Sequence, residues 1–301
     1  RFRDTLGDGR DPATGALAKD DGATLTLPAQ PPDDPPWYAS GVAATPDGKR
    51  LVVSSVNQKD VVVFDIDPAS PGYKTIIGSV DIGARETFGV FIDPQDAAGT
   101  RAYVPLWAGR KVLEIDLTDP TQPAVSRTFD TDQNPQGITF RPGTNQPFTA
   151  EHGPGHSDEV TALVAGGNAG WDPRPNLGAR GACPGDYCGY QGDATFMPMT
   201  DTTRFPNALR PTWNNTGSSQ GMGPATFLSG SQWKLWDGRL LVGVMGANRL
   251  DLLELNTAGT AATRSAFGSL LGARYRSLVQ APDGTLYIAT DGGEIWRVVP
   301  N

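Results

Sequence analysis

The stretch Gly41-Val-Ala-Ala-Thr-Pro-Asp-Gly-Lys-Arg-Leu-Val-Val-Ser-Ser55 joins two short apolar segments through a Pro-Asp-Gly turn. Val and Leu favour strands and Pro-Asp-Gly favours a tight turn, so the stretch predicts a β-hairpin. Similar phrases begin at Gly89-Val-Phe-Ile-Asp-Pro94 and at Gly137-Ile-Thr-Phe-Arg-Pro142. The opening glycines are separated by two equal steps of 48 residues, a period in the range of four-stranded propeller blades.

Two more copies of the phrase complete the pattern. One pairs Ala225-Thr-Phe-Leu228 with Leu240-Leu-Val-Gly243, and the other runs from Ser277 to Thr290 around a second Pro-Asp-Gly turn. No window shows a sustained helical period. We therefore predict an all-β fold, a β-propeller with five recognisable blades of up to four antiparallel strands, in a single domain over residues 1–301.

Two segments interrupt this rhythm. Residues 1–36 are polar, and within them Ala23-Thr-Leu-Thr-Leu27 reads as a strand that closes the ring by pairing with the last blade. Residues 172–222 contain many Gly and Pro and little alternation, which predicts a long loop excursion over one face. A degenerate sixth blade hidden in that segment is the alternative.

The charge balance restricts the partners. A net charge of −8 and no basic run argue against binding to nucleic acid or to an anionic membrane. No stretch approaches the roughly 20 apolar residues of a membrane span. Neutral or cationic partners are the ones that these features favour.

Cys183 and Cys188 are the two cysteines of the chain and stand close together in a turn-rich segment. We expect a disulfide between them, with two free thiols as the alternative, because no adjacent His completes a zinc site. A disulfide indicates an oxidising compartment, and the Asn214-Asn-Thr216 sequon is compatible with export. We therefore expect a secreted or periplasmic protein.

A set of motifs begins at Gln133. In order they are Asn134-Pro-Gln-Gly-Ile-Thr-Phe140, Glu151-His-Gly-Pro154 with Asp158-Glu159, Gly166-Gly-Asn-Ala-Gly-Trp171, Trp236-Asp-Gly-Arg-Leu-Leu-Val-Gly243, and the run from Arg274 to Asp291. Together they resemble the soluble pyrroloquinoline quinone (PQQ) dependent aldose sugar dehydrogenases, the glucose/sorbosone dehydrogenase family. Residues 40–118 match that family more loosely.

The resemblance implies a calcium- and PQQ-binding site. It assigns calcium to the backbone carbonyls of Gly153 and Pro154, and the quinone to Asn134 and Arg276, with Trp213 lining the pocket. Carbonyl oxygens suit a hard cation, and a guanidinium suits the carboxylates of the cofactor.

Acidic residues beside the Gly-Pro pair extend the predicted metal site. Glu151, Asp158 and Glu159 supply carboxylate oxygens for calcium, whereas a solvated turn is the alternative. Arg274 joins Arg276 as a candidate for the cofactor, because residues two apart on a strand share a face. Pairing of both arginines with acids on neighbouring blades is the alternative.

Departures from the family pattern leave the catalytic residue unknown. Gln133 and about Gly246 replace an Arg and a Lys, and the blade that carries the family's general-base His has no counterpart. The chain has only His152 and His156. The first hypothesis is a PQQ-dependent dehydrogenase that oxidises an aldose or related alcohol. The second is a non-catalytic, calcium-stabilised propeller that binds carbohydrate or a protein partner, for which Trp107 and Trp213 are candidate sugar-stacking platforms.

Overall fold

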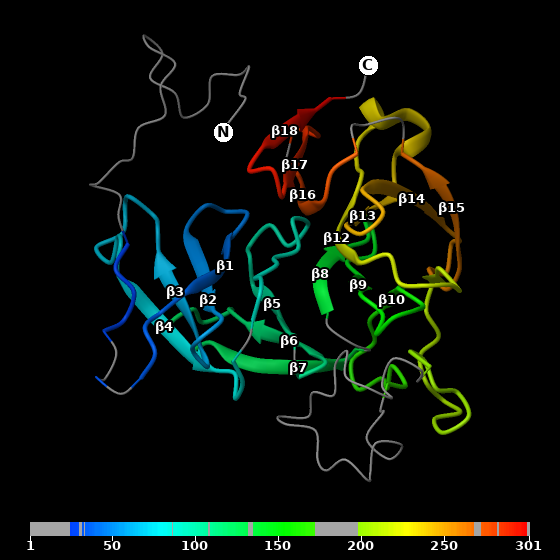
Figure 1. Ribbon diagram of the computed structural model, residues 1–301. Helices are drawn as coiled ribbons and strands as arrows, with labels where there is room; N and C mark the ends of the chain where they lie inside the picture. Colours follow the sequence, from blue (N-terminus) through cyan, green and yellow to red (C-terminus); the bar gives the residue numbers. More distant parts are fainter. Residues whose placement is uncertain are drawn as a thin grey trace.

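The chain folds into five antiparallel sheets arranged as a five-bladed β-propeller (Figure 1). This computed structural model describes residues 25–29, 32, 34–85, 87–107, 109–131, 135–171, 198–267, 272–281 and 283–299. The predicted all-β class and the five recognisable blades are confirmed. The one helical element of substance in these residues is the 3-10 helix Ser231–Trp236, in the first hairpin of the fourth blade.

We name the blades A to E in chain order. Their strands are β1 (Ala39–Ala44), β2 (Arg50–Ser55), β3 (Asp60–Asp65) and β4 (Ile76–Asp81) in blade A; β5 (Arg101–Leu106), β6 (Lys111–Asp116) and β7 (Ala124–Asp130) in blade B; β8 (Pro135–Phe140), β9 (Pro147–Glu151), β10 (Glu159–Ala162) and β11 (Trp213–Asn214) in blade C; β12 (Met222–Phe227), β13 (Leu240–Val244), β14 (Arg249–Leu255) and β15 (Ala262–Ala266) in blade D; and β16 (Tyr275–Gln280), β17 (Leu286–Thr290) and β18 (Ile295–Val298) in blade E. In blade B, residues 87–91 take the innermost place through isolated bridges to β5.

The predicted turn chemistry forms the first hairpin of blade A. The N–H of Gly48 donates to the carbonyl of Thr45 at 2.8 Å, and the Asp47 carboxylate accepts from the N–H of Lys49 at 3.1 Å. Gly48 has a φ of 69°, which L side chains rarely adopt. The equivalent turn of every other blade also contains a glycine with positive φ, namely Gly99, Gly143, Gly238 and Gly284.

The glycines spaced 48 residues apart lie where innermost segments of neighbouring blades touch. A Cβ on Gly41 would be 2.4 Å from the backbone carbon of Gly89, and one on Gly137 would be 3.0 Å from the carbonyl oxygen of Gly223. The first distance is too short for a side chain, and the second would require the backbone at Gly223 to move by a few tenths of an ångström. The sequence period therefore reflects close approach at the propeller axis.

Apolar clusters fill the spaces between consecutive blades. Each cluster unites residues of two blades, as shown by the pairs Val52 with Val104 for A and B, Tyr103 with Ile138 for B and C, Phe148 with Met222 for C and D, and Leu241 with Leu278 for D and E. Burial of these side chains is the main stabilising contribution to such a ring.

The N-terminal segment packs on blade A. Residues 25–29 are not in a strand, and Leu25, Leu27 and Trp37 contact a cluster of Val53, Val62 and Phe64. Pairing of this segment with the last blade stays a prediction.

Within residues 198–222, the described part of the predicted loop excursion, β11 pairs with β10 as the fourth strand of blade C. Cys183 and Cys188 lie outside the described residues, so the disulfide stays a prediction. Over the described part of the chain, no helix combines the length and apolar character needed to cross a bilayer.

Candidate functional site

One end of the propeller axis gathers the predicted site residues. All blades share the same up-and-down strand order, so innermost strands begin, and second strands finish, at the same end of the ring. We call it the axial end. The residues that follow the second strands there are Val56, Trp107, His152, Met245 and Asp291.

Two loops pair with each other at the axial end. The loop 152–158 connects β9 to β10, and the loop 215–221 leads from β11 to β12. The N–H of Ser157 donates to the carbonyl of Gly217 at 2.8 Å, and the N–H of Ser219 donates to the carbonyl of Gly155 at 2.9 Å. These contacts fix loops that lie about 60 residues apart in the sequence.

Asp158 holds the two loops together. Its side chain is buried, with the residue only 1% exposed, and it accepts four hydrogen bonds. The donors are the N–H of Gly153 at 2.9 Å, the hydroxyl of Ser219 at 2.5 Å, the N–H of Gln220 at 2.7 Å and the amide of Asn215 at 3.3 Å. Both carboxylate oxygens are therefore committed to protein donors.

Gly153 has a steric reason to be glycine. A Cβ at this position would lie 1.8 Å from the carbonyl oxygen of His156, inside the same loop. The loop conformation that presents the Gly153–Pro154 peptide thus excludes any side chain here.

His152 turns toward the inner strands. A Cβ on Gly221, which directly precedes β12, would contact the His152 ring at 3.5 Å. Burial lowers the pKa of His152, the Asp158 charge raises it in part, and the Arg274 charge lowers it further. The loop 152–158 therefore lies beside the innermost strands of blades D and E and not on the outer rim.

Arg274 and Arg276 share one carboxylate. The Nε atom of Arg274 lies 3.2 Å from Asp291, and Arg276 binds the same carboxylate through Nε and through Nη2 at 3.1 Å. The two arginines do share a face, as predicted, but their acid belongs to their own blade and not to a neighbour. Hydrogen bonding from Arg276 lowers the pKa of Asp291. This cluster of two half-exposed guanidiniums and one carboxylate carries a net positive charge of its own.

The three predicted acidic ligands do not converge. Glu151 and Glu159 are buried and directly opposite each other on β9 and β10. Glu151 accepts from the hydroxyl of Thr161, and Glu159 accepts from that of Thr200. Among the described residues, no group of three or more His, Cys, Asp or Glu side chains is placed to hold a metal ion.

The aromatic candidates occupy different environments. Trp213 lies in β11 and packs against the apolar cluster between blades C and D, where it has a packing role. Trp107 lies at the axial end and forms an edge-on contact with Phe88, with ring centroids 5.8 Å apart. Phe88 is 50% exposed. Asn134 and Gln133 lie outside the described residues.

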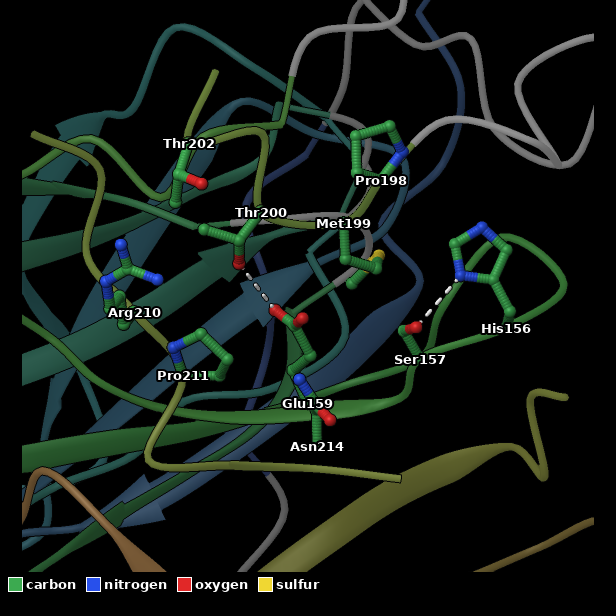
Figure 2. Close-up of a pocket in the computed structure, with 10 residues that line it drawn as sticks. All are labelled: His156, Ser157, Glu159, Pro198, Met199, Thr200, Thr202, Arg210, Pro211 and Asn214. Atoms are coloured by element: carbon green, nitrogen blue, oxygen red, sulfur yellow. Dashed lines mark hydrogen bonds between the residues drawn. The ribbon is translucent and has the colours of Figure 1, made fainter. Parts of the chain in front are cut away.

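A cavity of about 450 Å³ opens on the other side of the loop 152–158. Figure 2 shows Thr200 bonded to Glu159 in its middle, Arg210 to one side and His156 with Ser157 to the other. Arg210, Thr200 and Thr202 were not predicted as site residues. No sequence signal marks them, because segments distant in sequence form the cavity wall.

The family profile described as glucose/sorbosone dehydrogenase matches residues 132–297, more than half of the chain. The chain belongs to this family. Aldose sugar dehydrogenase YliI of Escherichia coli (strain K12) is 28% identical over 173 residues, which cover 56% of this chain and 42% of that protein. An uncharacterized protein of Synechocystis is 27% identical over 173 residues, covering 55% of this chain and 37% of that protein. The aligned part thus spans less than half of these relatives.

Solved structures of sugar dehydrogenases have the same fold. A glucose dehydrogenase superposes with a TM-score of 0.60 at 18% identity, covering 89% of this chain and 84% of that chain. The apo form of the soluble aldose sugar dehydrogenase of Escherichia coli gives 0.58 at 16% identity, covering 91% and 87%. The PQQ domain of pyranose dehydrogenase from Coprinopsis cinerea gives 0.55 at 16% identity, covering 86% and 81%.

Proposed function

We propose that this chain is a PQQ-dependent oxidoreductase that oxidises an aldose or a related alcohol at the axial end of the propeller. The single observation that carries the proposal is the pair of half-exposed guanidiniums, Arg274 and Arg276, which share Asp291 beside the loop 152–158. Family membership supports the same conclusion.

The residues present fit an anionic, planar cofactor. The Nη1 atom of Arg276 contacts the sulfur of Met245 at 3.3 Å, and a thioether is a weak acceptor. A carboxylate is a much better partner for that N–H, so exchange of the sulfur for a cofactor carboxylate is favourable. Arg276 would bind the cofactor directly, and Arg274 would add charge.

When bound, PQQ would supply the oxidant: oxidation of an aldose at C1 to the lactone removes two electrons and two protons, which the quinone would take up in becoming the quinol. The chain would bind the cofactor and orient the sugar over it. The exposed ring of Phe88, set edge-on to Trp107, offers an apolar face at the same end of the axis. Aromatic faces of this kind suit the C–H face of a pyranose ring. No residue of the chain is assigned as the base.

In this proposal, only backbone carbonyl oxygens bind calcium. Asp158 is saturated by protein donors, so the carbonyls of Gly153 and Pro154 are the groups that would hold the ion. The loop conformation, which permits only glycine at position 153, would keep these carbonyls in place.

A second function is favoured by one specific observation. Both histidines of the chain lie in the loop 152–158, and no blade of the chain corresponds to the one that carries the general-base His in the family. A propeller that lacks the general base of its family would retain a carbohydrate-binding face at the axial end and catalyse nothing.

The experiment is a PQQ titration of the purified chain, with and without calcium, followed by the cofactor spectrum and by aldose-dependent dye reduction. We expect binding at micromolar PQQ and turnover of an aldose. Arg276→Gln is expected to weaken PQQ binding by about tenfold or more, because a charge-assisted contact contributes about 1.5–3 kcal/mol.

Arg239→Gln is the matched control, because Arg239 pairs with Glu254 in blade D, at the end of β13 opposite to Met245. It should bind PQQ as the wild type does. Sugar binding without turnover would support the second function, and failure to bind PQQ at micromolar concentration would overturn the first.

We also infer a location outside the reducing cytoplasm, supported by the cysteine pair in the sequence. Thiol titration of the unfolded, unreduced protein should find no reactive cysteine. Two reactive thiols in protein isolated without reductant would contradict that location.

A further inference from the structure

The cavity behind the loop 152–158 is separate from the axial cluster. His156 and Ser157 line it, whereas His152 of the same loop faces Gly221 on the other side. Neither axial arginine belongs to its wall. A ligand in this cavity would therefore not compete for the groups assigned to PQQ.

Arg210 brings an uncommitted positive charge to the cavity. Across the described residues, its guanidinium forms no hydrogen bond and no ion pair, although most other arginines of the ring are paired. An arginine side chain at a cavity wall is a ready partner for a carboxylate, since its planar fork matches the two oxygens.

Most of the other residues in the wall are polar and carry hydroxyl, amide and carboxylate groups. Figure 2 shows the hydroxyls of Thr200 and Thr202 on one side, and Ser157 and Asn214 on others. Glu159, only 2% exposed, contributes a carboxylate from the floor. Such a mixture of donors and acceptors matches a molecule with several hydroxyl groups.

Apolar surface is present in small pieces. Pro198, Met199 and Pro211 line the cavity beside the polar groups, and such patches suit the C–H faces of a sugar. A cavity of about 450 Å³ has the volume of small-molecule sites in general and is large enough for a monosaccharide.

We propose that this cavity binds a monosaccharide that carries one carboxylate, such as an aldonate or a uronate. The carboxylate pairs with the guanidinium of Arg210, and the ring or chain hydroxyls bond to the threonines, Asn214 and Glu159. The proposal stands independently of PQQ binding, because it uses none of the axial residues.

Two other ligand classes fit less well. A phosphate ester would bring up to two negative charges close to the buried carboxylate of Glu159, and Arg210 alone would face them. An amino acid would require its ammonium group to be desolvated against Glu159, which already accepts from Thr200. A neutral hydroxyl donor has a smaller desolvation cost.

The test is isothermal titration calorimetry of the full chain, without PQQ or calcium, with glucuronate, gluconate, glucose, acetate and alanine as separate probes. We expect glucuronate or gluconate to bind at least about tenfold more tightly than glucose and acetate, since carboxylate and hydroxyl contacts are both needed.

Arg210→Gln should weaken binding of the sugar acid by about tenfold or more, and Arg210→Lys should retain part of it, because Lys keeps the charge but loses the fork. Arg85→Gln is the matched control, since Arg85 is another exposed arginine, located after β4 and away from the cavity. It should bind as the wild type does.

Equal affinity for glucose and glucuronate would overturn the proposal, as would unchanged binding by Arg210→Gln, preference for alanine, or no heat at millimolar ligand. Loss of PQQ binding in Arg276→Gln with sugar-acid binding intact would show that the two sites are distinct. Loss of sugar-acid binding in that variant would contradict the proposed independence.

Discussion

Two aspartates at the axial end differ in how they are held. Asp158 is buried, and its four donors belong to two loops of the backbone that it joins. Asp291 is exposed to water, and its donors are two long side chains that also reach solvent. The Asp158 carboxylate fixes the conformation of the two loops, whereas the Asp291 carboxylate can exchange its partners. The same residue type therefore has a structural role in one place and, in the proposed function, releases its arginines to a ligand in the other.

Asp251 is a useful third case because it combines features of both. It pairs with two arginines, as Asp291 does, through contacts of 2.9 Å to Arg249 and 2.7 Å to Arg264. It is also fully buried, as Asp158 nearly is. Comparing the three aspartates separates the effect of burial on stability from the effect of the hydrogen-bond donors on stability.

The largest loss of stability is expected for Asp158→Ala. Removal of the carboxylate leaves the buried N–H of Gly153 and the part-buried N–H of Gln220 without their acceptor. We expect the free energy of unfolding to fall by about 4 kcal/mol, measured by urea denaturation. Asp158→Asn keeps the shape and should lose less. A loss below about 1 kcal/mol would remove the distinction between the two aspartates.

An intermediate loss of stability is expected for Asp251→Ala. The free energy of unfolding should fall by about 2 kcal/mol, because Arg249 and Arg264 can reach water once the carboxylate is removed. Burial alone raises the pKa of Asp251, but hydrogen bonds from Arg264 and Arg249 outweigh it and hold the pKa below its usual value of 3.8. The stabilisation is thus complete above about pH 4 and is lost as pH falls through the lowered pKa.

The check is to compare urea denaturation at about pH 6 with that at about pH 3. The difference between wild type and Asp251→Ala should shrink at the lower pH. A constant difference would show that the carboxylate acts by packing and not by charge.

The smallest loss is expected for Asp291→Asn, which should leave the urea midpoint unchanged because exposed ion pairs contribute little. Its effect should appear in binding. With Asp291 no longer competing, Arg274 and Arg276 are free for a carboxylate, and PQQ affinity should rise by about threefold or more in the spectral titration. Weaker PQQ binding would instead show that Asp291 orients the arginines.

Sequence periodicity was sufficient to predict the fold because each blade repeats a hairpin between strands that are neighbours in the sequence. Gly41, Gly89 and Gly137 recur at a fixed step in the innermost segments, where Gly41 lies against Gly89 and Gly137 against Gly223. The turn glycines, such as Gly48, follow from backbone geometry within a few residues. Short strands inside irregular segments gave no such signal, which is why β11 was not foreseen.

The candidate site was only partly predictable, because its contacts are long-range. Alternation placed Arg274 and Arg276 on one face, but it could not identify Asp291 as their common partner. Adjacency suggested Asp158 as a metal ligand, yet donors from Asn215 to Gln220 determine its role. Arg210 has no neighbour in sequence that indicates a cavity.

Four innermost strands, β1, β8, β12 and β16, each shift register near their first residues. Pairing of these innermost strands is therefore interrupted at one rim of the ring. The ladder further down each blade holds the architecture whatever side chains occupy that rim. Replacement of residues there can change what the protein recognises while the number and spacing of blades stay constant, so new specificities can arise without refolding the scaffold.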